Sequence, residues 1–313
     1  MIIVGGEALV DLVNERGTSR VVAGGGPFNT AIALGRLGVE VAFLGTLSSD
    51  GYGEMLERQL SEVGVDTSFV RRSQAPTPKA RVDRGDDGRN EYEFDLLSTA
   101  FGDFPNGAIP ELPDTAWALH LGTLALAIEP PAGAFEALID REAGRRAIII
   151  DPNVRPVIFG DVDPYRRRFE RIATLADIVK LSADDAAWLY PALTPDQALE
   201  SILELGPRIV AVTLGAKGAI GGSGAVRVRV QGIAVDVLDT VGAGDAFGGA
   251  LIAALLEREV LGPAQTDDVD TTVLSDAIGF AVLASAITCT RVGADPPTRA
   301  EIEEWVGTER SSV

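Results

Sequence analysis

Hydrophobic runs of strand length alternate with amphipathic stretches along most of the chain. The predicted strands are IIVGGEALVDL (2–12), VEVAFLGTL (39–47), WALHLG (117–122), AIIIDPN (147–153), ADIVKLS (176–182) and RIVAVTLG (208–215). The predicted helices include PFNTAIALGRLG (27–38), GYGEMLERQLSEVG (51–64), PPAGAFEALIDREAG (130–144) and DPYRRRFERIATLA (163–176). Strands this apolar, separated by helices, are typical of a parallel sheet covered by helices on both faces. We therefore expect an α/β fold whose functional loops gather at the carboxyl ends of the strands.

One region departs from this rhythm. KARVDRGDDGRNEYEFD, residues 79–95, alternates with period two around a Gly-Asp-Asp-Gly turn, which predicts a hairpin. With LVNERGTSRVV, residues 12–22, it could form a small antiparallel sheet outside the main core. Such a sheet is either decoration on a sheet edge or a lid, and we favour a lid because protruding segments beside a cleft often close it. We expect a single domain over 1–313 with lid segments at about 12–22 and 79–98.

Composition narrows the classes of partner. The 313 residues are 46% hydrophobic, which is ample for a sizeable core. The net charge of −19 repels nucleic acid and anionic membrane surfaces. A lone cysteine, Cys289, excludes a disulfide within the chain and fits a reducing compartment. The N-terminus lacks the features of a secretion signal, and the apolar run 277–290 is shorter than the roughly 18 residues of a membrane span. We expect a cytoplasmic protein with neither nucleic acid nor membrane as a partner.

The segment LDTVGAGDAFGGALIAALLE, residues 238–257, places small residues and one acid at the head of an apolar helix. It is not the dinucleotide-binding fingerprint, because Phe247 stands where the last glycine should be, and no glycine precedes a lysine as in a P-loop. A Gly-Ala-Gly turn opening a helix over 243–257 would leave backbone N–H groups free for an anion. Asp245 in the first turn is equally an ordinary helix-stabilising residue. The segment alone leaves both interpretations open.

Two long motifs carry a family resemblance. DTVGAGDAFGGAL (239–251) and GGGPFNTAIALGRLGVEVAFLGTLSSDGYGEML (24–56) resemble the two signatures of the ribokinase-like (PfkB) carbohydrate kinases. Shorter matches are DPNVRP (151–156), VKLSADD (179–185), VTLGAKGA (212–219) and TRVGA (290–294). GGGPFNTA, DPNVRP and VKLS look most like the fructokinase branch. The resemblance implies a ribokinase-like fold and ATP-dependent phosphorylation of a free sugar, with fructose favoured.

The resemblance also implies roles for the residues at the head of the helix. Asp245 matches the general base that takes the proton from the attacking sugar hydroxyl, a role that suits a carboxylate in phosphoryl transfer. The N–H groups of Gly242, Ala243 and Gly244 would form an anion hole for the charge that shifts during transfer. An acidic protein could therefore bind ATP without a basic surface.

The sugar contacts that the resemblance implies lie mostly in the first third of the chain. They are Asp11, Gly25, Gly26, Asn29 and Arg155, with Asp245. Asp11, expected at the end of the first strand, can accept two hydrogen bonds from neighbouring hydroxyls. Without the resemblance, Asp11 would be an ordinary loop acid, Asn29 a first-turn helix residue and Arg155 half of a surface ion pair. Asp151 and Asn153 beside Arg155 are similar candidates, although Asn153 could simply shape a turn.

The nucleotide contacts follow later in the chain. They are Lys180, Ser182, Thr213, Gly215, Lys217, Gly218 and Gly244. Gly218 in a plain hairpin is the structural alternative. Mg²⁺ is needed with ATP, and the family's N-x-x-E appears here as Ser182-Ala183-Asp184-Asp185, so we expect Asp185 to hold Mg²⁺ through water.

The resemblance also implies a monovalent cation site, with K⁺ as its occupant. Asp239 and Val241 match one flank of that site, and Thr288 and Gly293 approximate the other. Carbonyl ligands leave little signature, so the sequence leaves open whether K⁺ is used. The sole histidine, His120, is expected at a strand end near the substrate.

Several alternatives remain open at this stage. The substrate could be 2-keto-3-deoxygluconate, ribose, tagatose or a nucleoside, and Tyr92, Phe94 and Phe101 could stack on a base. A non-catalytic sugar-binding regulator is the other class of function, although the intact Asp245 argues against it. The resemblance also raises a homodimer formed through the lid.

Overall fold

The computed structural model describes residues 1–15, 18–84, 90–104, 109–262 and 269–310. The strands are β1 (Ile2–Gly5), β2 (Leu9–Glu15), β3 (Thr18–Gly24), β4 (Val41–Ser48), β5 (Val70–Ser73), β6 (Lys79–Arg84), β7 (Asn90–Asp95), β8 (Ala118–Gly122), β9 (Ala147–Asp151), β10 (Ile178–Ser182), β11 (Ile209–Thr213), β12 (Ala219–Ser223) and β13 (Val226–Val230). The α-helices are α1 (Gly26–Arg36), α2 (Gly51–Glu62), α3 (Pro131–Glu142), α4 (Pro156–Phe159), α5 (Val162–Ala173), α6 (Ala183–Leu189), α7 (Pro195–Leu205), α8 (Ala243–Glu257), α9 (Thr271–Cys289) and α10 (Arg299–Arg310). Two short 3₁₀ turns are η1 (Thr123–Leu126) and η2 (Gly215–Lys217).

The main sheet has nine strands in the order β13-β12-β11-β10-β9-β8-β1-β4-β5. The strands from β11 to β5 pair in parallel, which confirms the parallel sheet expected from the apolar runs. At one edge β12 and β13 pair antiparallel. The hairpin that the sequence analysis kept as an alternative at Gly218 joins β11 to β12, whereas β13, which alternates valine with arginine, was not foreseen.

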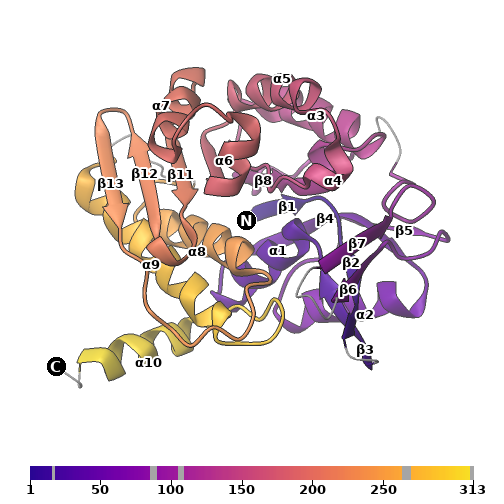
Figure 1. Cartoon of the computed structure of the whole chain (residues 1–313). Coiled ribbons are helices and arrows are strands. Elements are labelled where there is room, and N and C mark those ends of the chain that lie inside the picture. Colours follow the sequence, from indigo (N-terminus) through magenta and orange to yellow (C-terminus); the bar gives the residue numbers. More distant parts are fainter. Residues whose placement is uncertain (16–17, 85–89, 105–108, 263–268, 311–313) are drawn as a thin grey trace.

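Helices cover both faces of this sheet, as expected (Figure 1). Alternate residues of each strand belong to different apolar layers, as the two-residue period of a strand requires. In β1, Ile2 and Val4 belong to the layer that includes α1, α8 and α9. Ile3, between them, belongs to the layer that includes α3, α5, α6 and α7. Both faces are therefore buried, which explains why the strands are apolar throughout.

The predicted first strand, residues 2–12, is in fact two strands in two sheets. β1 ends at Gly5 and β2 begins at Leu9. Gly6 has φ +147°, and a Cβ there would lie 2.4 Å from the Pro27 ring, so only glycine fits this bend. The hydrophobicity continues across the bend because both strands are buried, and this hid the break. Asp11 accordingly lies within β2, opposite Val22 and Ala80, and not at the end of the first strand.

The second sheet contains the two predicted lid segments, in the order β3-β2-β6-β7. It is not wholly antiparallel as expected, because β2 and β6, which are distant in sequence, pair in parallel. The Gly-Asp-Asp-Gly turn at 85–88 lies outside the described residues. Figure 1 shows these four strands grouped on the opposite side of the molecule from β11, β12 and β13. We call this sheet the lid sheet.

Helix α9 is long and apolar enough to cross a membrane by length and composition alone. It starts earlier than the apolar run noted in the sequence, at Thr271. Within the fold it packs along α8 and against β12 and β13. More than half of its apolar window is buried by these contacts, 56%, and core helices of soluble proteins pass the same test.

Candidate active site

The first turn of α8 is built as an anion site. Gly242, the N-cap, is left-handed with φ +75°, and a Cβ there would lie 2.4 Å from that of Ala294. Ala246 N–H donates to Gly242 at 2.8 Å, which begins the helical hydrogen bonding. The N–H groups before it, at Gly244 and Asp245, have no carbonyl one turn earlier in the helix. They and the helix dipole favour negative charge at this point.

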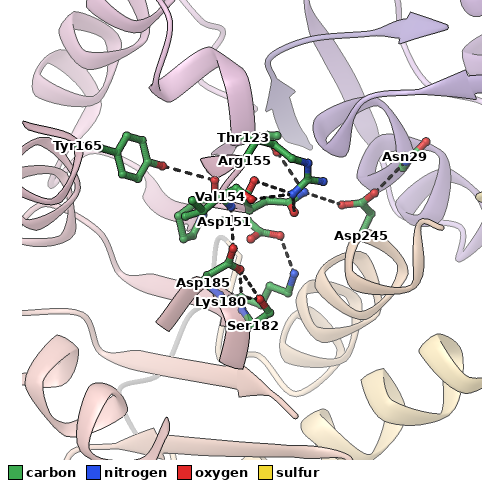
Figure 2. A network of polar contacts seen from close by, with 12 residues as sticks. Asn29, Thr123, Asp151, Val154, Arg155, Tyr165, Lys180, Ser182, Asp185 and Asp245 are labelled. Carbon is green, nitrogen blue, oxygen red and sulfur yellow. Dashed lines mark hydrogen bonds and ion pairs between the residues drawn. The ribbon is translucent and has the colours of Figure 1, made fainter. Parts of the chain in front are cut away.

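Asp245 lies at this helix end and is 7% exposed. Its Oδ2 accepts a hydrogen bond from Asn29 Nδ2 at 2.8 Å, and its Oδ1 accepts a long one from Asn153 Nδ2 at 3.4 Å (Figure 2). Burial raises the pKa of Asp245 to about 6, while the nearby Lys180 charge and the Asn29 hydrogen bond act to lower it. The carboxylate is therefore ionised near pH 7, yet close enough to neutrality to accept a proton.

Glycine allows the start of α1 to approach this carboxylate. A Cβ at Gly26 would lie 2.4 Å from Thr123 Oγ1, 2.9 Å from Asn153 Nδ2 and 3.4 Å from Asp245 Oδ1. Gly25 before it has φ +108°, and its Cβ would meet the Glu7 carbonyl oxygen at 2.6 Å. The double glycine thus brings the backbone of α1 against the polar groups around Asp245.

A cavity of about 590 Å³ opens over these groups. It gathers the predicted sugar contacts, the anion hole and part of the predicted cation site from distant parts of the sequence. Its lining includes Asp11, Gly25, Gly26, Asn29, Asn153, Arg155, Asp239, Val241, Gly242, Gly244, Asp245 and Gly293. Ala243 starts α8 between two of these residues.

Asp11 and Arg155 stand on the sugar side of this cavity. Burial raises the pKa of Asp11 to about 6, and the positive charge of Arg155 acts in the opposite direction. Arg155 Nη1 donates to the Asn153 side chain at 2.7 Å and to the Val154 carbonyl at 3.1 Å. Arg155 is therefore held by its own turn and by no surface carboxylate in the described part of the chain.

A buried ion pair lies behind the cavity. Lys180 Nζ is 2.7 Å from Asp151 Oδ2, and both side chains are almost fully buried. A Cβ at Gly244 would lie 3.3 Å from Lys180 Nζ, so this ammonium group lies directly beside the anion hole (Figure 2). We expected His120 at a strand end near the substrate, and this prediction is wrong. His120 lies inside β8, where burial and the nearby Lys180 charge lower its pKa to about 3.

The remaining nucleotide candidates gather at the carboxyl ends of two neighbouring strands. Ser182 and Thr213 are register partners at the ends of β10 and β11. Gly215 and Lys217 follow in η2, where Lys217 is exposed. Gly218 has φ +95°, and a Cβ there would lie 2.1 Å from the Val230 carbonyl oxygen, so backbone packing alone requires this glycine. Among the described residues, none of these five lines the cavity over Asp245.

Asp185 has a structural role that bears on Mg²⁺. Its Oδ2 accepts from Ser182 N–H and Oγ at 2.8 and 2.7 Å, in a capping box that starts α6. Its Oδ1 accepts from Val154 N–H at 2.7 Å. Both oxygens are thus engaged, which suits contact with Mg²⁺ through water better than direct ligation. Within the described residues no three His, Cys, Asp or Glu side chains cluster as metal ligands.

The two flanks of the expected K⁺ site are joined by Asp239. Its Oδ2 accepts from Gly293 N–H at 3.0 Å and its Oδ1 from Val241 N–H at 3.2 Å. Thr288 lies farther away in α9, wholly buried, with its hydroxyl donating to the Ala284 carbonyl at 2.8 Å. Its hydroxyl hydrogen is therefore used within the helix, while the hydroxyl oxygen keeps its acceptor capacity.

Sequence reasoning missed several residues that line the cavity, among them Glu7, Arg20 and Thr123. Glu7 is buried, its Oε2 accepts from Ala125 N–H at 3.2 Å, and burial raises its pKa to about 8. The available signal was an acid within an otherwise apolar run. Thr123 Oγ1 accepts from Asn153 at 3.3 Å and Arg20 pairs with Asp239, and neither contact has a local sequence signature.

Comparison with known proteins agrees with this geometry. The pattern of the pfkB family carbohydrate kinases matches residues 6–301. A fructokinase of Rhizobium leguminosarum bv. trifolii is 37% identical over 280 residues, which cover 88% of this chain and 85% of that protein. A fructokinase of Vibrio cholerae, solved with fructose, ADP and calcium, has a TM-score of 0.83 at 27% identity, with 97% of each chain covered.

A second solved structure resembles the chain equally well. Aminoimidazole riboside kinase of Salmonella enterica, complexed with aminoimidazole riboside and an ATP analog, also has a TM-score of 0.83 at 27% identity, covering 97% of this chain and 99% of that one. These neighbours confirm the ribokinase-like fold. Fold, cavity and family pattern agree, and the chain belongs to the pfkB family of carbohydrate kinases.

Proposed function

We propose that this protein transfers the γ-phosphoryl group of ATP to a hydroxyl of a free sugar, with fructose as the favoured substrate. One observation carries the proposal: the buried Asp245 carboxylate stands at an open helix N-terminus inside a cavity that also holds Asp11 and Asn29. A proton acceptor, an anion site and hydroxyl-binding side chains thus share one space. The fructokinase relatives support fructose, and the Vibrio cholerae complex supports a site for sugar and nucleotide together.

The chemistry follows from this placement. Asp245 accepts the proton of the sugar hydroxyl as its oxygen bonds to the γ-phosphorus and the bond from that phosphorus to the ADP oxygen breaks. The N–H groups at the start of α8 stabilise charge on the transferred group. Asn29 holds Asp245 Oδ2 at 2.8 Å and so directs the other oxygen toward the cavity. Asp11 and Arg155, which line the same cavity, orient the sugar.

Mg²⁺ would neutralise the ATP phosphates, and Asp185 would contact it through water, since both carboxylate oxygens already accept hydrogen bonds. K⁺ would bind beside Asp239, where the Val241 and Gly293 backbones meet. Ser182, Thr213, Gly215, Lys217 and Gly218 would bind the nucleotide at the ends of β10 and β11. Lys180, beside Gly244, would add positive charge behind the phosphates.

A riboside is the second candidate substrate. Phe94 of β7 lines the cavity and offers an aromatic face to a base, and the Salmonella enterica riboside kinase is as similar in structure as the fructokinase. Phe101 is buried in the core instead, 5% exposed, and the Tyr92 side chain lies outside the described residues. One aromatic wall provides less stacking than two, which favours the sugar.

The test is ATP consumption measured with fructose, ribose, tagatose, 2-keto-3-deoxygluconate and adenosine. We expect kcat/KM to be highest for fructose. The Asp245→Asn protein serves as the blank for contaminating kinases. A value for adenosine or ribose at least about tenfold above that for fructose would replace fructose as the substrate, and no turnover with any compound would refute the kinase function.

A further inference from the structure

Arg20 brings a positive charge from the lid sheet to the anion hole. It lies in β3 and lines the cavity together with Gly242 and Gly244 of the α8 turn. Its Nη2 is 3.9 Å from Asp239 Oδ2, and its side chain is 38% exposed. β3 also approaches the neighbouring loop, since a Cβ at Gly293 would lie 3.5 Å from Val22 Cγ1. The lid sheet therefore borders the phosphate side of the cavity as well as the sugar side.

The cavity is short of positive charge for the ligand it would hold. Its lining includes the carboxyl groups of Glu7, Asp11, Asp239 and Asp245 but only two arginines, Arg20 and Arg155. Arg155 Nη1 already donates to Asn153 and Val154 within its own turn. The Arg20 side chain, by contrast, has no hydrogen bond among the described residues that ties it down and pairs only loosely with Asp239, three residues before Gly242 of the α8 turn.

The pair between Arg20 and Asp239 is weak enough to exchange. At 3.9 Å it is longer than a hydrogen bond, and the Arg20 side chain is 38% exposed, although that of Asp239 is only 9% exposed. Asp239 would keep two backbone hydrogen bonds without Arg20, from Val241 and Gly293. The arginine could therefore leave without releasing the loop that shapes the anion hole.

We propose that Arg20 is a catalytic residue that leaves Asp239 and binds the phosphoryl group during its transfer from ATP to the sugar, an inference that rests on the proposed kinase function. A planar guanidinium can donate two parallel hydrogen bonds to phosphoryl oxygens, and charge spreads over these oxygens in the transition state. Because Arg20 belongs to the lid sheet, closure over the sugar completes the phosphoryl site. ATP without sugar would then meet an incomplete site.

The test compares Arg20→Met with Arg81→Met as a matched control. Arg81 belongs to the same sheet, pairs with Glu93 at 3.8 Å, is 58% exposed and does not line the cavity. We expect Arg20→Met to lower kcat by about 100-fold or more, as loss of a phosphoryl-binding arginine does. The KM for sugar should stay within about threefold, because the hydroxyl contacts remain. Arg81→Met should keep the parent kcat.

Chemical rescue separates a catalytic role from a structural one. In Arg20→Ala, added methylguanidinium should raise kcat at least about tenfold, whereas tetramethylammonium of equal concentration should not. A kcat for Arg20→Met within about threefold of the parent, or a loss confined to the KM for sugar, would overturn the inference while leaving the kinase function intact. If the parent protein phosphorylates no sugar, the proposed function fails first, and this inference fails with it.

Discussion

The buried position of Asp245 determines both its pKa and the role as a base that we propose for it. A first-turn aspartate on an exposed helix would stabilise the helix and titrate near its usual value. Here the side chain is buried against α1, and burial raises its pKa to about 6. The residue therefore gives up some of its value as a helix-stabilising charge and becomes a better proton acceptor near neutral pH.

Replacing Asp245 with asparagine tests the base role. The change keeps the size and removes the charge and the proton acceptor, so kcat should fall by roughly two to four orders of magnitude. The KM for sugar should change little, since Asp11, Gly26 and Asn29 remain in place. Steady-state kinetics with a melting curve would check this. Turnover within about tenfold of the parent, together with a modest loss of stability, would make Asp245 a helix cap.

The pH profile gives an independent check on the same residue. A base must be ionised to act, so with a pKa raised to about 6 the activity should be full above pH 7 and fall as pH drops through about 6. Asp11 titrates in the same range, because burial raises its pKa to about 6 as well. Asp11→Asn should therefore raise the KM for sugar but leave the acid limb of kcat in place. Loss of that limb in Asp11→Asn would assign it to Asp11.

The pH dependence of stability that Glu7 predicts has the opposite sign from that of a carboxylate whose pKa is lowered by folding. The folded-state pKa of Glu7 is raised to about 8 from 4.5, so the folded protein holds a proton that the unfolded chain releases. Stability should then fall as pH rises from about 4.5 to 8. Glu7→Gln removes this dependence while Gln Oε1 still accepts from Ala125 N–H. We expect the variant to melt higher than the parent at pH 8 and alike at pH 4.5, and equal melting at both would show that Glu7 is ionised in the fold.

At the scale of elements, β9 and β10 place a charged pair where the sheet is otherwise apolar. Asp151 ends β9 and Lys180 lies within β10, and their ion pair touches the start of α8. Removing one partner leaves the other charge buried alone, so Lys180→Met should cost about 3–5 kcal/mol of unfolding free energy. Adding Asp151→Leu should restore part of it, because a buried apolar pair needs no desolvation of charge.

The single variant Lys180→Met should also raise the pKa of Asp245, the proposed base. Lys180 acts to lower the pKa of Asp245, so its loss should move the acid limb of kcat to higher pH. Urea unfolding and kcat measured against pH check both effects in one protein. A limb that stays in place while stability falls would confine Lys180 to a structural role.

The elements show what a sequence reveals and what it conceals. Apolar runs placed the parallel strands well because these strands are buried on both faces, and the Gly-Ala-Gly turn before an apolar stretch placed the helix Ala243–Glu257, which is buried on nearly all sides. The pattern failed at Gly6, where two buried strands of different sheets join and only Glu7 interrupts the apolar run. It also failed for β13, whose pairing depends on tertiary packing against α9.

The residues of the candidate site likewise include some that the sequence identifies and some that only the fold brings together. Asp245, Asn29 and Arg155 belong to motifs that a family resemblance identifies, and the structure brings them into one cavity. Arg20 and Thr123 contact the site only because the lid sheet and η1 fold over it, so no local pattern marks them. The place of Thr288 on one flank of the cation site stays a prediction, and the bond of its hydroxyl to a carbonyl of its own helix depends on helix geometry that no local pattern marks.

At the scale of the whole molecule, the lid sheet is nearly independent of the main sheet in its pairing. Its four strands pair only with one another among the described strands. It nevertheless supplies Asp11, Arg20 and Phe94 to the cavity. In the mechanism that we propose, the main sheet and α8 would thus carry the anion site and the base, while the second sheet would control access to the sugar. The homodimer through the lid that the family resemblance raised stays a prediction.

Deleting the hairpin tests whether the lid sheet acts mainly on sugar binding while α8 acts on catalysis. Joining Ala80 to Asp95 through a short glycine-rich turn removes residues 81–94, including Phe94, but keeps β2 with Asp11 and β3 with Arg20. Lys79 and Asp95 are already cross-strand partners, so a tight turn can close the gap. Both apolar layers of the main sheet consist almost wholly of residues outside this stretch, so the core should still fold cooperatively.

We expect the KM for sugar to rise at least about tenfold in this variant, because the Phe94 wall and the hairpin's share of the lid are lost while β3 with Arg20 is kept. The kcat at saturating sugar should fall less, since Asp245 and the α8 turn are untouched. A second variant, which replaces only the turn 85–88 with a glycine-rich turn of equal length, controls for the effect of a new turn without loss of the hairpin strands. An unchanged KM would make the hairpin decoration at a sheet edge. Sedimentation of the deletion variant beside the parent tests whether a homodimer forms through the lid sheet. If the parent is a dimer and the lid sheet forms the contact, only the deletion variant should sediment as a monomer. Equal sedimentation of the two proteins would place any dimer contact elsewhere.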